Sequence, residues 1–223
     1  MIGNDIVDLH YFDSPFYQHI RYLERVCTPL EADRVRKSKD ASRALAEVWT
    51  AKEAAYKLVS RNSGLRHFVP RDFVTDIVER GPRSAYDELQ VSFNGKKAKV
   101  TTFGTAQWLH AVAVFADCCY LHWKVQEIHK PPFGIITPSD ESDIARQLAR
   151  DLLHECGLKK VSLSPTGKIP TAVQDGSCDR EMAISLSHHG AFVAAAIAWI
   201  SAESPKQVQA LSGALKGESS RAA

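Results

Sequence analysis

Long apolar runs and an excess charge of one sign are both missing from this sequence of 223 residues. Nowhere do about 18 apolar residues follow one another, so the sequence predicts no membrane-spanning helix. The opening MIGNDIVDL has no basic segment leading into an apolar stretch, and we therefore expect no secretory signal. Lys and Arg number 28 and Asp and Glu 26, a balance that gives no general indication of nucleic-acid binding.

Cysteine is scarce, and its spacing matches neither a disulfide framework nor a zinc site. The five cysteines form an odd set without a CxxC motif, namely Cys27, Cys118, Cys119, Cys156 and Cys178. We expect reduced thiols in a cytoplasmic protein. The hydrophobic content of 44% and the charged content of 24% are typical of a folded globular chain, which at this length forms one domain or two small halves.

Local patterns predict helices and strands in both parts of the chain. Thr28-Pro29-Leu30-Glu31 is typical of a capping box that starts a helix, and residues 42–60 carry apolar side chains at helical spacing. A strand is expected over residues 2–9, and an antiparallel meander is expected over residues 73–79, 89–93, 97–103 and 108–116.

The Pro-rich stretch at residues 129–140 predicts a boundary between two halves. The first half is then residues 1–128. The second, residues 141–203, contains a helix over 141–155 and two strands, and residues 204–223 form a flexible tail. WLHAVAV in the first half and FVAAAI in the second share a pattern that suggests a diverged internal duplication.

Asp5 is the first candidate functional residue. Strand alternation places it on one side with Val7 and Leu9, and Asn4 on the other. A buried, unpaired carboxylate is costly, so such a residue normally has a cation or a metal beside it. A strand-end Asp that reaches solvent or caps a helix is the alternative, and the strand alone favours it.

Glu53 and Lys57 are the second candidate pair, four residues apart on one face of the expected helix. An exposed ion pair worth about 0.2–0.5 kcal/mol explains this spacing by itself. Two carboxylates from different elements together with a lysine are, however, what a Mg²⁺-diphosphate site requires, because Mg²⁺ takes oxygen ligands and keeps waters and phosphates as the rest.

A strand that ends in a tight turn, ISLSHHG, supplies Ser187 and His188. Their hydroxyl and imidazole, with the turn amides, could hold a phosphate; a hairpin with exposed histidines is the alternative. Lys168, in the sequence SPTGKIP, is either a phosphate contact or a solvated loop lysine.

Together these elements resemble the motifs of the 4′-phosphopantetheinyl transferase superfamily. GNDIVD (residues 3–8) is similar to G-x-D-I-V-E, and WTAKEAAYK (49–57) fits W-x-x-K-E-A-x-x-K at every fixed position. RYLERVCT (21–28) resembles the R-F-x-x-R-V-F-T stretch of holo-acyl-carrier-protein synthases, while GKIP (167–170) and SLSH (185–188) resemble G-K-P and S-x-S-H.

The resemblance implies an α+β fold of two similar halves related by pseudo-twofold symmetry, each with a small antiparallel sheet packed on a long helix. The short synthases of the family form homotrimers, and the long type is a two-half pseudodimer whose S-H half comes first. Here the half with Asp5 and Glu53 comes first, so we expect a monomeric pseudodimer with its halves in permuted order.

The resemblance also implies an activity, in which the phosphopantetheine of coenzyme A moves to a serine of an apo carrier protein of fatty-acid or polyketide biosynthesis. Asp5 and Glu53 would hold Mg²⁺, with Glu53 as the base, and Lys57 would contact the diphosphate. Ser187 and His188 would hold the coenzyme's phosphates, with Lys168 near the adenine or its 3′-phosphate.

Family analogy directs Arg21 and Arg25 at an acidic helix of the carrier protein, although solvated basic residues on an amphipathic helix would show the same spacing. Two departures from the family motifs stand out: GKIP is one residue longer than G-K-P, and Val7 replaces a second metal-binding acid of the long type. Two other functions fit parts of the sequence, a non-catalytic coenzyme A or carrier-protein binding module and a metal-dependent phosphohydrolase.

Overall fold

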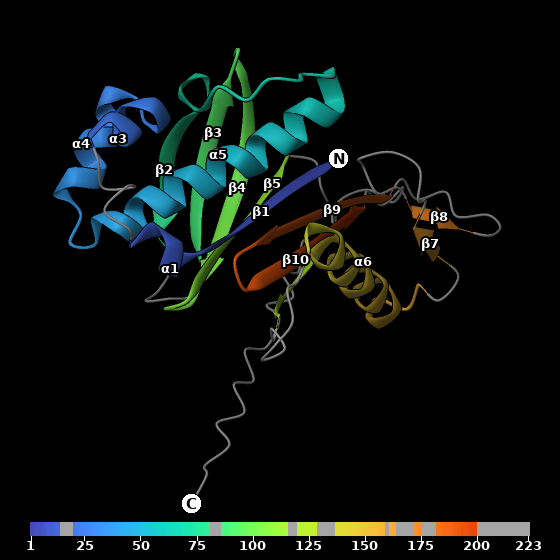
Figure 1. Ribbon diagram of the computed structural model, residues 1–223. Coiled ribbons are helices and arrows are strands. Elements are labelled where there is room, and N and C mark those ends of the chain that lie inside the picture. Colours follow the sequence, from blue (N-terminus) through green and yellow to red (C-terminus); the bar gives the residue numbers. More distant parts are fainter. Residues whose placement is uncertain are drawn as a thin grey trace, which may run out of the picture.

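The computed structural model describes residues 1–13, 20–80, 86–115, 120–128, 137–158, 161–163, 172–174 and 182–199. Two antiparallel sheets, each with a helix against it, form the body of the molecule (Figure 1). The helices are α1 (Leu9–Phe12), α3 (Ile20–Val26), α4 (Pro29–Lys37), α5 (Ala41–Ser63), the 3₁₀ turn η1 (Pro70–Asp72) and α6 (Pro138–Glu155). The strands are β1 (Ile2–Asp8), β2 (Val74–Arg80), β3 (Asp87–Phe93), β4 (Lys96–Gly104), β5 (Trp108–Val114), β6 (Tyr120–Glu127), β7 (Val161–Leu163), β8 (Ala172–Gln174), β9 (Met182–His189) and β10 (Phe192–Trp199).

The first sheet has five strands in the order β1-β5-β4-β3-β2. The expected meander is confirmed, because β2, β3, β4 and β5 pair in succession and antiparallel. Asn94 and Gly95 join β3 to β4 with φ angles of 46° and 76°, the left-handed conformations that a two-residue hairpin turn of this sequence requires. β1 closes the other edge by pairing with β5, so that Asp5 lies opposite Ala111.

Helix α5 crosses one face of this sheet and packs on β1 and β5 (Figure 1). Asp40 caps its start by accepting a hydrogen bond from the amide of Arg43, and Gly64 ends it at φ 69°. Gly3 allows the strand to approach the helix, because a Cβ atom there would lie 2.6 Å from the backbone nitrogen of Leu58. This contact fixes where β1 lies relative to α5.

The second sheet has the order β6-β10-β9 and packs against α6, while β7 and β8 form a separate two-stranded sheet. Leu148, Leu152, Val193 and Ile197 are among the buried residues between α6 and the second sheet. α6 begins at Pro138, three residues before its expected start at 141, because Thr137 forms a capping box with Asp140.

Strand β6 belongs to the second sheet. Its residues fall inside 1–128, the expected first half, yet β6 pairs along its whole length with β10 of the second sheet. The expected elements given above do not include this strand, although Leu121, Trp123 and Val125 alternate with polar residues in YLHWKVQE as in a half-buried strand. Its pairing is made with residues about 70 positions away, which no local pattern specifies.

β1 joins the two sheets, since it pairs with β5 and also lies against β9 and β10 (Figure 1). The amide of Asn4 donates to the hydroxyl of Ser185 on β9 over 2.9 Å. Arg61 of α5 donates from one guanidinium nitrogen to the carbonyl oxygens of Ile2 and Ile184, each over 2.7 Å. The first and last parts of the chain are therefore held together at one strand.

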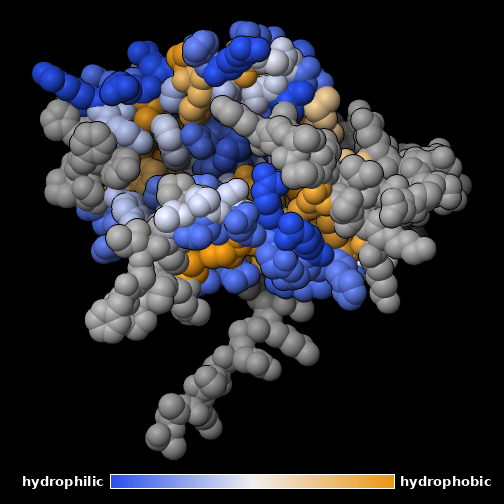
Figure 2. All heavy atoms as spheres, turned by 45° about the vertical axis from the view of Figure 1, so that its right-hand side comes forward, coloured by the Kyte–Doolittle hydropathy of each residue, from blue (hydrophilic) through white to orange (hydrophobic). Residues whose placement is uncertain are grey.

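Helices α3 and α4 cover one end of α5. The expected capping box at Thr28 is confirmed, with the Thr28 hydroxyl and the Glu31 carboxylate each accepting the other residue's amide. Figure 2 shows hydrophilic residues over much of the visible face, with hydrophobic residues gathered mainly on its lower part. Among the helices of the described residues, none is long and apolar enough to cross a membrane.

Candidate active site between the two sheets

A pocket of about 400 Å³ lies where β1 and α5 of the first sheet meet β9 of the second. Asp5, Glu53 and Lys57 line it from one side, and Ser187 and His188 line it from the other. These five residues come from separate sequence motifs, and the fold brings them around one cavity. We therefore take this pocket as the candidate active site.

The acidic side of the pocket contains two carboxylates and one ammonium group. Asp5 accepts a hydrogen bond from Nζ of Lys57 at 2.7 Å, and a carboxylate oxygen of Glu53 lies 3.9 Å from the same nitrogen. Alternation along β1 has the expected sense, because Asp5 contacts α5 while Asn4 contacts β9. The side chains of Lys57 and Glu53 are 28% and 26% exposed. They are therefore partly buried and do not form the exposed ion pair that was the alternative explanation of their spacing.

Burial raises the pKa of Glu53 to about 7, and the neighbouring charge and hydrogen bond of Asp5 add to this effect, whereas Lys57 lowers it. The nearby carboxylate of Asp5 thus disfavours the ionisation of Glu53. A divalent cation would relieve that repulsion, so the donor set fits Mg²⁺. Within the described residues, no group of three or more His, Cys, Asp or Glu side chains could hold a metal, so two protein ligands is the most that this site offers.

On the opposite wall, Ser187 accepts a hydrogen bond from the side-chain nitrogen of Asn4 at 3.1 Å. A hydroxyl that accepts in this way keeps its own proton to donate, and Ser187 is one of the residues that line the pocket. Nδ1 of His188 lies 2.9 Å from a carboxylate oxygen of Glu141 on α6. The serine and the histidine are therefore both held by side chains outside the S-x-S-H motif.

The turn after β9 is attached to Asp8 at the end of β1. The amide of Asp8 donates to Nδ1 of His189, and the amide of Ala191 donates to a carboxylate oxygen of Asp8 at 3.0 Å. Gly190 has φ 60°, and a Cβ atom there would lie 2.6 Å from Cβ of Asp8. The amide of Ala191, one of the turn amides considered for phosphate binding, is thus already occupied.

A buried polar cluster lies behind Ser187. The side-chain nitrogen of Asn4 also lies 3.1 Å from Nε2 of His110 on β5, and burial, with Lys57 nearby, lowers the pKa of His110 to about 3. His110 is therefore neutral, and as Nε2 accepts from Asn4 its proton is on Nδ1. In the described part of the chain, Oδ1 of Asn4 and Nδ1 of His110 have no hydrogen-bond partner.

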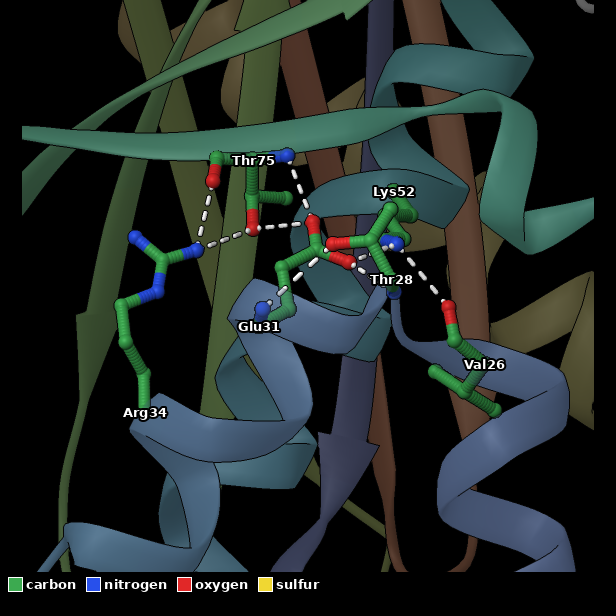
Figure 3. A network of polar contacts seen from close by, with 6 residues as sticks. All are labelled: Val26, Thr28, Glu31, Arg34, Lys52 and Thr75. Atoms are coloured by element: carbon green, nitrogen blue, oxygen red, sulfur yellow. Dashed lines mark hydrogen bonds and ion pairs between the residues drawn. The ribbon is translucent and has the colours of Figure 1, made fainter.

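Lys52, the first lysine of the WTAKEAAYK motif, points away from the pocket. It is fully buried and donates to the carbonyl of Val26 at 2.9 Å and to Glu31 at 2.6 Å (Figure 3). Glu31 also accepts from the amide and hydroxyl of Thr75, and Arg34 donates to the carbonyl of Thr75. These contacts join α3, α4, α5 and β2, so Lys52 holds the helical layer against the sheet.

Aromatic residues form the apolar part of the pocket wall, namely Phe12, Tyr22 and Trp49. The rings of Tyr22 and Trp49 have centroids 6.2 Å apart. Tyr22 belongs to α3, the helix that also carries Arg21 and Arg25, both exposed. The two arginines are thus on an element that borders the pocket.

The structure also shows what the sequence analysis missed. Lys168 lies outside the described residues, as do most of the GKIP flanks. Asn4, His110 and Glu141 were not expected near the site. Strand alternation had placed Asn4 on the side of β1 opposite Asp5, and this is the side that contacts β9. Glu141 contacts His188 only because α6 packs on β9, and no local sequence pattern indicates this contact.

A second cavity, of about 510 Å³, lies at the N-terminal end of α5 and includes Arg43, Glu47 and Thr102. Its polar groups bind one another or the backbone: Arg43 donates to the carbonyl of Thr105, and Thr102 donates to Glu47. The cavity contains no residue of the motifs described above. We therefore take the smaller pocket, which is lined by the residues of the sequence motifs, as the candidate active site.

Comparison with known proteins gives a matching family and similar solved structures. The sequence model of the 4′-phosphopantetheinyl transferase superfamily matches residues 1–113. A crystal structure of holo-[acyl-carrier-protein] synthase from Neisseria meningitidis is similar at 20% sequence identity and a TM-score of 0.41, over 51% of this chain and 97% of that one. No curated protein matches the sequence. Since the family match spans half of the chain and includes the elements that carry Asp5, Glu53 and Lys57, the protein belongs to the 4′-phosphopantetheinyl transferase superfamily.

Proposed function

We propose that the protein transfers the 4′-phosphopantetheine group of coenzyme A to a serine of an apo acyl or peptidyl carrier protein, that it releases 3′,5′-ADP, and that it requires Mg²⁺. The observation that carries this proposal is the single pocket with a carboxylate pair and Lys57 on one side and Ser187 and His188 on the other. A diphosphate substrate needs both a cation site and hydrogen-bond donors for its oxygens, and residues of both kinds line this pocket, which supports the proposal.

Asp5 and Glu53 would hold the Mg²⁺, which when bound neutralises charge on the diphosphate oxygens. Lys57, already 2.7 Å from Asp5, would contact the same diphosphate as a point charge. The serine hydroxyl of the carrier attacks the β-phosphorus of coenzyme A, and the bond from that phosphorus to the oxygen of 3′,5′-ADP breaks. The proton of the hydroxyl goes to Glu53, which is our proposed base.

Ser187 and His188 would donate to the coenzyme's phosphates from the β9 wall, and we place Lys168 near the adenine or the 3′-phosphate. Phe12, Tyr22 and Trp49 offer an apolar surface on which the pantetheine arm can lie. Arg21 and Arg25 would attract an acidic helix of the carrier protein, and their position on α3 beside Tyr22 supports docking next to the pocket.

We further propose that the chain is a pseudodimer with permuted halves. In the first sheet β1-β5-β4 packs on α5, which follows β1, and in the second β6-β10-β9 packs on α6, which follows β6. This matching order of elements supports an internal duplication, and it moves the proposed boundary from residues 129–140 to the segment between β5 and β6. Because one chain supplies both walls of the pocket, a monomer would be sufficient for activity.

The decisive experiment is the intact mass of an apo acyl carrier protein after incubation with this protein, coenzyme A and Mg²⁺, with a parallel sample in EDTA. We expect a gain of one phosphopantetheine that EDTA and the Glu53→Gln substitution each prevent. Coenzyme A binding without any gain on several carriers would favour the binding module instead. Hydrolysis of the diphosphate without a carrier would favour a phosphohydrolase.

A further inference from the structure

Glu141, in the first turn of α6, contacts the imidazole of His188 from behind the pocket. The distance from its carboxylate oxygen to Nδ1 is 2.9 Å, and the two side chains are 19% and 40% exposed. His188 lines the pocket, whereas Glu141 does not. The carboxylate therefore contacts Nδ1 of the imidazole without itself lining the pocket.

The capped start of α6 fixes the position of Glu141. The Thr137 hydroxyl and the Asp140 carboxylate form a capping box, and the amide of Glu141 donates to the carbonyl of Thr137 at 3.1 Å. Near a helix N-terminus a carboxylate is also stabilised by the helix dipole. Glu141 is thus anchored at the capped start of the helix.

The contact determines which protons His188 carries when it binds an anion. A carboxylate accepts hydrogen bonds only, so Nδ1 must carry a proton toward Glu141. A phosphate in the pocket likewise accepts, so it requires a proton on Nε2. A ring held between the carboxylate and such an anion therefore has to donate from both of its nitrogens.

We propose that Glu141 is a positioning residue for coenzyme A, which acts through His188 by holding its ring in one orientation. This inference rests on the proposed function, since it assigns a cause for phosphate binding in the same pocket. Other charged or titratable groups also line that pocket, namely Asp5, Glu53, Lys57 and His189, and the test therefore has to isolate the contact of Glu141 with His188.

The test substitutes Glu141→Gln, which keeps the size of the side chain and removes its charge. Asp143→Asn is the matched control, because Asp143 is exposed and lies on the same helix two residues further along. Calorimetry with coenzyme A and the kinetics of carrier modification are measured for both variants. We expect Glu141→Gln to raise the Kd and the KM for coenzyme A about tenfold, the effect of one weakened charge-assisted hydrogen bond, with kcat changed less than about twofold. Asp143→Asn should leave both constants unchanged.

A second pair of variants separates this mechanism from a purely structural role. In a His188→Asn background, Glu141→Gln should cause no further loss of affinity, because its effect passes through the imidazole. An unchanged Kd in the single variant, or an equal loss with and without His188, would overturn the inference. A wild-type protein that binds coenzyme A but modifies no carrier would refute the proposed function, while the Kd comparison would still decide the role of Glu141. If the wild type does not bind coenzyme A, both proposals fail.

Discussion

Replacing Glu53 with Gln should stabilise the metal-free protein while it abolishes transfer. The pKa of Glu53 is raised from 4.5 to about 7, chiefly by burial and then by Asp5, so the folded state binds its proton more tightly than the unfolded state does. Below pH 4.5 the side chain is protonated in both states and costs nothing. Between pH 4.5 and about 7 the unfolded form ionises while the folded form stays protonated, so stability is lost over this interval, and above about 7 the loss is constant.

The size of this effect follows from the two pKa values. Their interval corresponds to about 3 kcal/mol at alkaline pH, and partial solvent access to the side chain reduces the gain expected from Gln to about 1–2 kcal/mol. Urea unfolding in EDTA should therefore show a higher midpoint for Glu53→Gln at pH 8 and little difference at pH 5. Added Mg²⁺ should narrow the difference at pH 8, because only the wild type keeps both carboxylates and is stabilised by binding.

Glu24→Gln serves as the control, since Glu24 is an exposed glutamate on α3. It should leave unfolding unchanged at both pH values. Two results would refute the reasoning that ionised Glu53 destabilises the metal-free protein. One is a Glu53→Gln protein that is less stable than the wild type at pH 8, and the other is a gain in stability that is the same at pH 5 and pH 8.

Three further substitutions or measurements test how the fold supports the site. Gly3→Ala should lower the melting temperature markedly and reduce activity with it, because the new methyl group would meet the carbonyl of Ala54 on α5 and push β1 away. Lys52→Met should cost about 3–5 kcal/mol in urea unfolding by leaving Glu31 buried without its cation, and the double variant with Glu31→Gln should recover part of that loss. The pKa of His110 is lowered to about 3, so its imidazole should show no titration by NMR between pH 5 and pH 8 and should carry its proton on Nδ1. Burial of the neutral ring should lower the free energy of unfolding only as the pH drops below about 6.5, where the imidazole of the unfolded chain becomes protonated.

Local signals in the sequence were sufficient for most individual elements. The capping box at Thr28, the Ala-rich helix before Gly64 and the Asn94-Gly95 turn each depend on contacts between residues a few positions apart, and the structure has all three. The motifs around Asp5 and Glu53 were likewise recognisable, because their spacing lies within one strand or one helix. What such motifs cannot specify is which other part of the chain completes the site.

The pairing of β6 shows where local information ends. Leu121, Trp123 and Val125 alternate with polar residues as in a half-buried strand, but this local pattern does not specify the pairing partner, which is β10, about 70 positions later. Glu141 is a second example, because an acidic residue in the first turn of a helix is common and does not indicate a functional contact. Its contact with His188 exists only after α6 has packed on the second sheet.

The sequence by itself therefore determined the candidate chemistry, namely an acid pair with a lysine and a serine-histidine strand in a family of phosphopantetheinyl transferases. The tertiary structure decided that these groups line one pocket, that Lys52 of the same motif is buried as a structural cation, and that Asn4 and Glu141 hold the opposite wall. The physical reason is that helix and turn formation depend on near neighbours. Burial, pKa shifts and contacts across β1 arise only when distant segments exclude water from one another.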